Sequence, residues 1–232
     1  MKYLISCLFF LFILNSSFTQ SGYHFGVKGG LSLASQNWNN SERRFLLTNH
    51  VNLFIESRDP DDKGSLFAQI GYHTRGSSIR ISLLNAGFDD GYTFKNASLL
   101  IGAKRKTTTF KNTRPYYFMG LRAEYNLNHN LEDIILRYCT GQFQKTTFPF
   151  PIPGYVNKFT YGISIGGGFE FSGSKFFNPA LEFTLSPDLS YQYDAPEDNT
   201  GSIGIPQSRI RNITFEISLV LRFLREIVYE DR

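Results

Sequence analysis

Apolar and polar residues alternate along most of the chain, and the alternation is clearest near its C-terminal end. Every second residue from Ile213 to Phe223 is large and apolar, whereas the residues between them are mostly polar, with Val220 as the exception. Because successive side chains of a strand point to opposite faces, segment 210–223 predicts a strand with one apolar face and one polar, charged face. Such a strand is long enough to cross a bilayer when it is tilted.

The same alternation recurs in seven earlier segments. Together with the last one, they predict strands at 23–34, 45–56, 66–81, 97–103, 116–126, 159–171, 180–185 and 210–223. Eight is an even number, and it is the smallest common strand number of membrane barrels. The predicted fold is therefore all-β, an eight-stranded antiparallel up-and-down transmembrane β-barrel.

The connections between the predicted strands alternate in length. Each odd-numbered connection is longer than the even-numbered ones beside it. Outer-membrane barrels have short periplasmic turns and longer outer loops. The pattern therefore predicts that both chain ends are periplasmic and that the outer loops are 36–44, 82–95, 128–158 and 187–209.

The start of the chain has the features of a secretory signal peptide. Lys2 is followed by an apolar run from Leu4 to Leu14 and then by small residues before Gln20. We expect a signal peptide at 1–19 and one barrel domain at 20–232. No later stretch approaches the roughly 18 apolar residues of a transmembrane helix, so a position in the membrane would require a closed barrel.

Composition narrows the possible functions. Aromatic residues make up 16% and charged residues 19% of the chain, whereas soluble domains carry about 25% charged residues. The net charge of +4 is not concentrated in a long run, so nucleic-acid binding is not expected. No histidine has metal-ligand spacing with another His, Cys or carboxylate. We therefore expect no cofactor, no metal and no catalytic site.

The inward-facing positions of the predicted strands carry acidic and basic residues in balance. We expect them to form an interior charge network that closes the lumen, with long side chains crossing over inward-facing glycines, because buried charges need partners. Glu170 and Glu182 need a cation between or beside them, and Arg122 and Arg222 are the candidates. The predicted network is Lys28, Arg75, Arg122, Glu124, Glu170, Glu182, Glu216 and Arg222, with Glu56 and Lys104 on the same face.

A basic turn follows the fourth predicted strand. It carries Lys104, Arg105, Lys106, Lys111 and Arg114 on the side that we expect to be periplasmic. One interpretation is a docking surface for an acidic partner. The other is attraction to the anionic headgroups of the inner leaflet.

Several short motifs resemble those of the PorT-like outer-membrane β-barrel family: Gly26–Leu31, Arg114–Leu121, Gly166–Glu170, and Pro179 with Glu182–Phe183. The resemblance covers nearly all of the chain after the predicted signal peptide. It implies an eight-stranded barrel in the outer membrane of a Gram-negative bacterium, and for some members a role in type IX protein secretion. One departure is the end of the chain, because such barrels often end on an aromatic residue and here 224–232 follow Phe223.

These observations favour a non-enzymatic integral outer-membrane barrel with a closed polar interior, and the expected role is in protein secretion or envelope assembly. The expected partners are outer-membrane lipid and secretion components, and the sequence assigns no small-molecule ligand. Two alternatives stay open. An outer-membrane lipid hydrolase or protease would use His50 or His73 at the outer rim, and a soluble periplasmic ligand-binding barrel would turn its charged face to water.

Overall fold

The strands of the protein close into one barrel. The computed structural model describes residues 22–36, 44–58, 63–83, 86–108, 110, 112–133, 152–171, 177–197 and 207–226. The barrel consists of β1 (Gly22–Gln36), β2 (Leu46–Arg58), β3 (Gly64–Leu83), β4 (Ala86–Lys106), β5 (Thr113–His129), β6 (Phe159–Phe171), β7 (Phe177–Pro187) and β10 (Asn212–Glu226).

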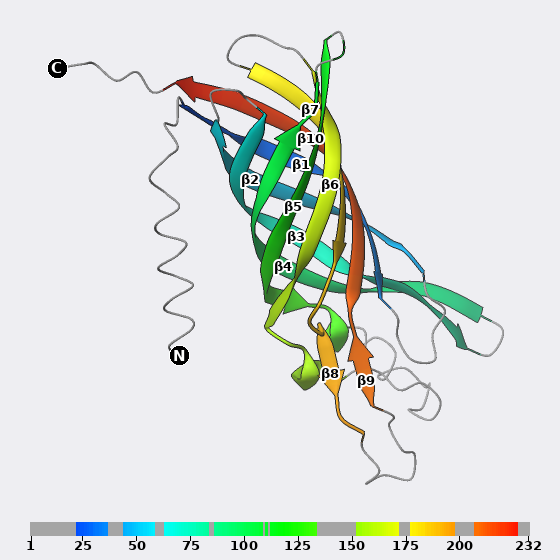
Figure 1. Cartoon of the computed structure of the whole chain (residues 1–232). Helices are drawn as coiled ribbons and strands as arrows, with labels where there is room; N and C mark the ends of the chain where they lie inside the picture. The colour runs from blue at the N-terminus through cyan, green and yellow to red at the C-terminus, as the bar shows by residue number, and fades with distance from the viewer. Residues whose placement is uncertain are drawn as a thin grey trace, which may run out of the picture.

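Neighbouring barrel strands are antiparallel, and the first pairs with the last. The order around the barrel is β1-β10-β7-β6-β5-β4-β3-β2, and the β1–β10 ladder runs from Gly22↔Glu226 to Gln36↔Asn212. The start of β1 and the end of β10 therefore lie at the same end of the barrel (Figure 1). The prediction of an eight-stranded antiparallel barrel is confirmed.

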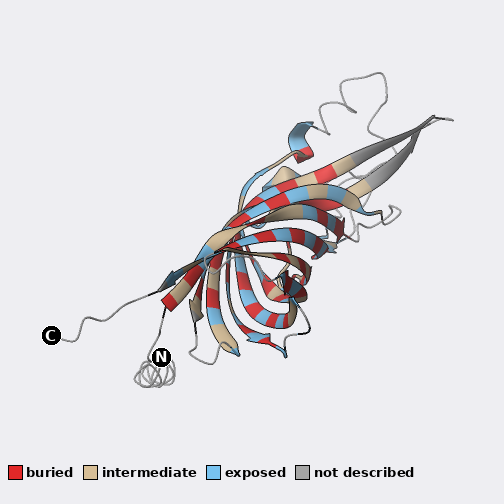
Figure 2. Cartoon of the chain, turned by 90° about the horizontal axis from the view of Figure 1, so that it is seen from above, coloured by how far each residue is buried: buried red, intermediate tan, exposed pale blue. Residues whose placement is uncertain are grey.

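Among the residues whose side chains are described, burial alternates along most of each barrel strand in the sense that the sequence predicts. On β10, Ile213, Leu219 and Phe223 are exposed on the outside, whereas Glu216 and Arg222 are buried inside. Figure 2 shows this alternation as bands of buried and exposed residues along the strands. The barrel is thus apolar outside and polar inside, which is the reverse of a soluble ligand-binding barrel.

The two ends of the barrel differ. The turn end is where β1 begins and β10 ends, and the loop end carries the described parts of the connections 130–158 and 188–207. The predicted loop at 82–95 is wrong, because β3 and β4 continue as a paired hairpin up to Leu83↔Ala86. Glycines and aspartates in 87–91 lower the strand propensity of this segment, but the ladder between the two strands supplies its backbone hydrogen bonds.

The loop end has a small hydrophobic core of its own. Part of the predicted loop 187–209 forms a two-stranded sheet of β8 (Tyr193–Ala195) and β9 (Ser208–Ile210), and the 3₁₀ turn η2 (Pro153–Tyr155) lies near it. In Figure 1 these elements lie at the end opposite to the end of β10. The core, which we call the loop-end cluster, consists of Tyr92, Phe94, Leu131, Tyr193, Ala195 and Ile210.

Some predictions fall outside the described residues. These are the signal peptide at 1–19, residues 37–43 of the predicted outer loop 36–44, Lys111, residues 134–151 of the predicted outer loop 128–158, and the tail 227–232. Among the described residues, no helix has the length and apolar character to cross a membrane.

Candidate functional site in the barrel lumen

Near the turn end, the lumen contains two carboxylates that share three cations. Arg222 bridges them, with one guanidinium nitrogen 2.5 Å from Glu56 Oε2 and the other 2.6 Å from Glu170 Oε2. Lys104 Nζ lies 2.8 Å from Glu56 Oε2, and Lys106 Nζ lies 3.5 Å from Glu170 Oε2. All five residues are buried. Each carboxylate thus has two cations, which offsets the cost of removing its charge from water.

An aromatic layer fills the next part of the lumen. Its members point inward from five strands, and Phe54 from a sixth strand, β2, packs against them. The members are Phe67, Leu100, Tyr116, Phe118, Ala180 and Val220. The rings of Phe67 and Phe118 meet edge to face, with their centroids 5.6 Å apart. Lys104 Nζ lies 4.6 Å from the centre of the Tyr116 ring, a cation–π geometry. The rings therefore separate the charges at the turn end from those farther along the barrel.

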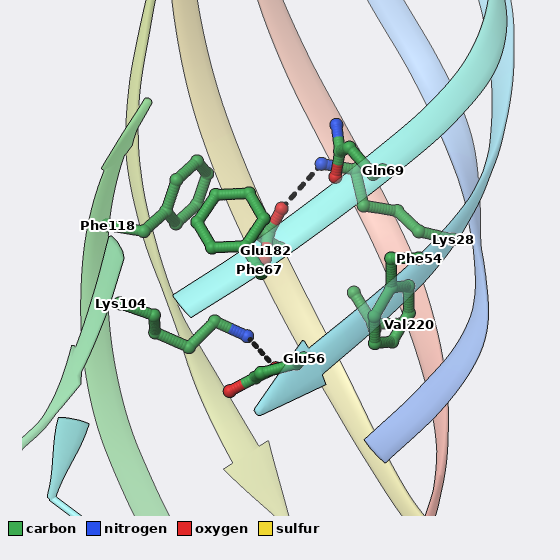
Figure 3. A pocket seen from close by; sticks show the side chains of 9 residues that line it. All are labelled: Lys28, Phe54, Glu56, Phe67, Gln69, Lys104, Phe118, Glu182 and Val220. Atoms are coloured by element: carbon green, nitrogen blue, oxygen red, sulfur yellow. Dashed lines mark hydrogen bonds and ion pairs between the residues drawn. The ribbon is translucent and has the colours of Figure 1, made fainter. Parts of the chain in front are cut away.

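One ion pair crosses this layer. Lys28 Nζ lies 2.6 Å from Glu182 Oε1, and the other oxygen of Glu182 accepts a hydrogen bond of 2.9 Å from Tyr116. Figure 3 shows this pair beside the Lys104–Glu56 pair, with Phe67 and Phe118 next to them. The cavity that these residues line has a volume of about 20 Å³, enough for about one water molecule. The described side chains therefore leave no continuous water-filled channel at this level.

Two stacked histidines follow toward the loop end. The rings of His50 and His73 lie 5.4 Å apart and nearly parallel. His50 Nδ1 and Nε2 each lie 2.8 Å from a serine hydroxyl, those of Ser32 and Ser218. His73 has a hydrogen bond of 3.0 Å to Glu216. Both histidines are buried in the lumen among these partners, so they do not form the exposed rim site of the enzyme alternative.

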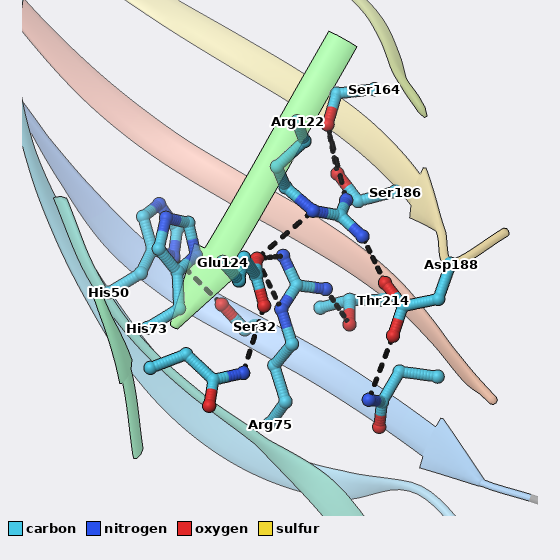
Figure 4. A network of polar contacts seen from close by, with 12 residues as sticks. Ser32, His50, His73, Arg75, Arg122, Glu124, Ser164, Ser186, Asp188 and Thr214 are labelled. Carbon is cyan, nitrogen blue, oxygen red and sulfur yellow. Dashed lines mark hydrogen bonds and ion pairs between the residues drawn. The ribbon is translucent and has the colours of Figure 1, made fainter. Parts of the chain in front are cut away.

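A second charge cluster occupies the half of the lumen nearer the loop end (Figure 4). Arg75, which is fully buried, pairs with Glu124 at 2.8 Å and donates to Thr214 at 2.5 Å. Arg122 lies 3.0 Å from Glu124 and also pairs with Asp188, just after β7. These contacts connect β3, β5, β7 and β10 across the lumen, so the cluster cross-links strands that are not neighbours.

The structure brings the predicted interior residues together in the lumen, although not all with the expected partners. Arg222 does contact Glu170. Glu182, however, is paired by Lys28, and Arg122 lies at the other cluster. The reason is depth. Glu182 lies opposite Gly168 on β6, two residues from Glu170. The register partner of Glu182 on β10 is Ser218, and the Lys28 side chain extends past Ser218 to reach Glu182.

The expected role of the inward glycines is only partly right. We expected charged chains to cross over them, and Arg122 does lie over Gly162. At the aromatic layer, rings use this space instead. A Cβ on Gly166 would lie 2.5 Å from Phe118, and one on Gly26 would lie 2.8 Å from Phe54. The rings fit the lumen because these positions have no side chain.

The basic turn predicted as a docking surface needs correction. Lys104 and Lys106 point into the lumen and are buried in ion pairs, because every second residue of β4 faces inward up to the last residue of the strand, Lys106. Arg105 is exposed and Arg114 is half-buried, and Lys111 lies outside the described residues. Of the turn's described cations, these two arginines are the ones not enclosed in the lumen.

Sequence reasoning missed several members of the lumen. Among them are Lys106, Asp188 and the aromatic layer. The sequence does contain a signal for the layer. Its members are apolar residues at positions of the alternation that are otherwise polar. Phe54 lies between two outward apolar residues, Leu53 and Ile55, and Val220 breaks the alternation of β10 in the same way. Such exceptions mark positions where the interior of a barrel is apolar.

The chemistry of the lumen is that of fixed, paired charges. Its ion pairs and its histidines are buried, and the described nucleophiles beside them, Ser32 and Ser218, are enclosed with them. Among the described residues, no group of three or more His, Cys, Asp or Glu side chains is arranged to hold a metal ion. The arrangement can hold the barrel in one shape and fill its interior.

Comparison with known proteins supports the fold. No family model matches the chain, and a search of curated proteins finds no significant match. Among solved structures, the outer-membrane protein AlkL in lipid bilayers aligns with a TM-score of 0.51 and 8% identity over 94% of this chain and 96% of that chain. Outer-membrane protein OprG from Pseudomonas aeruginosa aligns with 0.44 and 10% over 89% and 98%. The outer-membrane protease OmpT from Escherichia coli aligns with 0.40 and 9% over 90% and 98%. The chain therefore has the fold of outer-membrane barrels, a conclusion that rests on the likeness to AlkL.

Proposed function

We propose that this protein is a non-enzymatic integral barrel of a bacterial outer membrane, with a closed polar lumen and with its loop end facing outward. One observation carries the proposal, the distribution of side chains across the barrel wall. The outside exposes a continuous apolar band, for example Leu31, Leu53, Leu121 and Leu219, each at least 56% exposed. The buried charged residues of the same strands, among them Lys28, Glu56, Glu124 and Arg222, face inward and are paired. Only lipid makes favourable contacts with such an apolar outer surface.

The proposed role is that of a rigid support for the loop end. A lumen crossed by ion pairs between non-neighbouring strands cannot widen without separating buried charges, which is costly. The loop-end cluster holds β8, β9 and the residues around Leu131 on the barrel. A closed barrel that presents an ordered surface is suited to contact other components of the envelope, and it supplies no path for a solute.

Fractionation of cells expressing the full chain tests the membrane assignment. The protein should stay in the membrane fraction after washing with alkaline carbonate and should be released by detergent. In electrophoresis it should migrate differently before and after heating, as a stable barrel does. Recovery of the protein from the periplasmic soluble fraction without detergent would overturn the proposal.

The more specific role, an accessory of protein secretion, is also proposed. It is supported by the motifs that resemble the PorT-like family and by Arg105, which is exposed on the outward face of β4 near the turn end. Deletion should then block export of a class of cargo proteins. Arg105→Glu should release a periplasmic partner in a crosslinking experiment while the barrel still assembles, and Arg211→Glu, at an exposed arginine next to β9, is the control. An unchanged exported proteome in the deletion strain would remove the secretion role.

A further inference from the structure

The lipid-facing surface has a groove in a place where a barrel wall is expected to be convex. The groove has a volume of about 760 Å³ and lies on the outside of β2 to β6. This volume is within the range of about 300–1,000 Å³ that small-molecule sites occupy. Its lining side chains that face outward are apolar, so the groove lies within the band that contacts lipid.

Two small residues explain the groove. Strand register places Val51, Tyr72, Ala97, Tyr125 and Phe159 in one row across five strands. Ala97 thus lies between two tyrosines, and its methyl group leaves a slot between their rings. Tyr125 and Phe159 meet edge to face with their centroids 4.9 Å apart, which fixes one wall of the slot.

The next row toward the turn end continues the slot. It consists of Leu53, Ile70, Leu99, Ala123 and Tyr161. Here Ala123 is the small residue, between Leu99 and Tyr161. The slot therefore runs obliquely from Ala97 on β4 to Ala123 on the neighbouring strand β5.

A cation, Lys95, lies at the loop-end side of the slot. Lys95 is on the same face of β4 as Ala97, two residues closer to the loop end, or about 7 Å along a strand. Lys95 is exposed, and so is Lys158, which directly precedes Phe159. A lysine at this height can extend its ammonium group to the headgroup region while its methylene chain covers the apolar surface.

We propose that this groove is a binding site for an anionic, phosphate-bearing membrane lipid, with one acyl chain in the slot over Ala97 and Ala123 and the phosphate on Lys95. The proposal rests on the membrane assignment above. It commits to a lipid because an apolar slot and a cation at its loop-end mouth match the two parts of a single lipid molecule, and because the slot opens sideways to the bilayer.

Native mass spectrometry of the full chain released from vesicles tests the site. The vesicles contain equal amounts of phosphatidylglycerol and phosphatidylcholine with the same acyl chains. The parent protein should retain phosphatidylglycerol in preference to phosphatidylcholine. Lys95→Gln should lower this preference by about five-fold, the factor that corresponds to about 1 kcal/mol per lysine near an anionic surface. Ala97→Phe should fill the slot and abolish retention of both lipids.

Matched controls come from residues outside the groove. Ala103→Phe, on the same face of β4 near the turn end, and Arg211→Gln, at an exposed arginine, make the same kinds of change and should leave retention as in the parent. Every variant is also checked for heat-dependent mobility and membrane fractionation, so that loss of the barrel is distinguished from loss of the lipid. A correctly folded Ala97→Phe protein that retains lipid like the parent, or an unchanged preference in Lys95→Gln, would overturn the proposal.

Discussion

Lys28 on β1 and Glu182 on β7 form an ion pair of 2.6 Å across strands that are not neighbours, because β10 lies between them. The pair is buried, with 2% and 5% of the two residues exposed. It joins parts of the chain separated by 154 positions. Stability of the closed barrel should therefore depend on both charges being present or both being absent.

Lys28→Met should lower the free energy of unfolding by about 3–5 kcal/mol, because it leaves Glu182 buried without its cation. The double variant Lys28→Met with Glu182→Gln should be more stable than Lys28→Met alone, since no charge is then stranded. Urea unfolding of the protein in lipid vesicles measures both values. A double variant no more stable than the single one would contradict this account of the pair.

Arg222 and Arg209 allow a comparison of a buried and an exposed arginine. Arg222→Ala should destabilise the barrel by several kcal/mol, because Glu56 and Glu170 both lose a partner in the lumen. Arg209 pairs with Asp194 at 3.2 Å, but its side chain is 51% exposed, so Arg209→Ala should cost at most about 1 kcal/mol. Urea midpoints in vesicles give the ranking. Equal midpoints for the two variants would argue against the buried bridge.

Substitution by alanine should impair folding at Gly30 but not at the adjacent Gly29. A Cβ on the inward-facing Gly30 would lie 1.9 Å from the carbonyl oxygen of Ile217, a distance that requires the strands to move apart. The closest atom to a Cβ on the outward-facing Gly29 would be 3.4 Å away. Gly30→Ala should therefore reduce the yield of the folded, heat-modifiable form, whereas Gly29→Ala should fold like the parent. Normal folding of both variants would show that the β1–β10 contact is looser than described.

The predictability of this molecule from sequence follows from the geometry of strands. Period-two alternation determines which face of a strand is apolar, and it is visible without knowing the partner of any strand. It is sufficient for the barrel and for the inward position of Arg75 and Glu124. It does not determine the depth of a residue in the lumen. Depth depends on register, and therefore the partner of Glu182 could not be chosen between Arg122, Arg222 and Lys28.

Two other features depend on contacts that no local pattern contains. The strand formed by 86–95 has few residues with high strand propensity, and its inward residues Tyr92 and Phe94 pack against Leu131 and Ile210 from distant connections. Likewise, the sequence places Lys106 in a charged turn, and only the pairing of β4 with β5 up to Tyr116 shows that it still faces the lumen. Tertiary pairing decides both cases.

The loop-end cluster should control the protease resistance of the loop end independently of the barrel. Phe94 is fully buried there. Phe94→Ala removes a ring from a packed core, a change that typically costs about 3–5 kcal/mol. Limited proteolysis of the protein in vesicles should then cut the connections 130–158 and 188–207 faster, while the barrel keeps its heat-dependent mobility. Phe159→Ala, at a position 75% exposed on the outside, is the control and should not change the cleavage rate.

The barrel should be closed to ions, and the aromatic layer should be part of the seal. The lumen of an eight-stranded barrel is just wide enough for side chains. Here Phe67 and Phe118 meet inside it between the two charge clusters. The parent protein in a planar bilayer should show no stable conductance. Phe67→Ala with Phe118→Ala opens space for water at that level and should give a measurable leak, whereas truncating the outward-facing Phe159 and Phe215 should not. Steady large channels from the parent protein would refute a closed lumen, and a silent double variant would show that the charge clusters alone are sufficient to seal it.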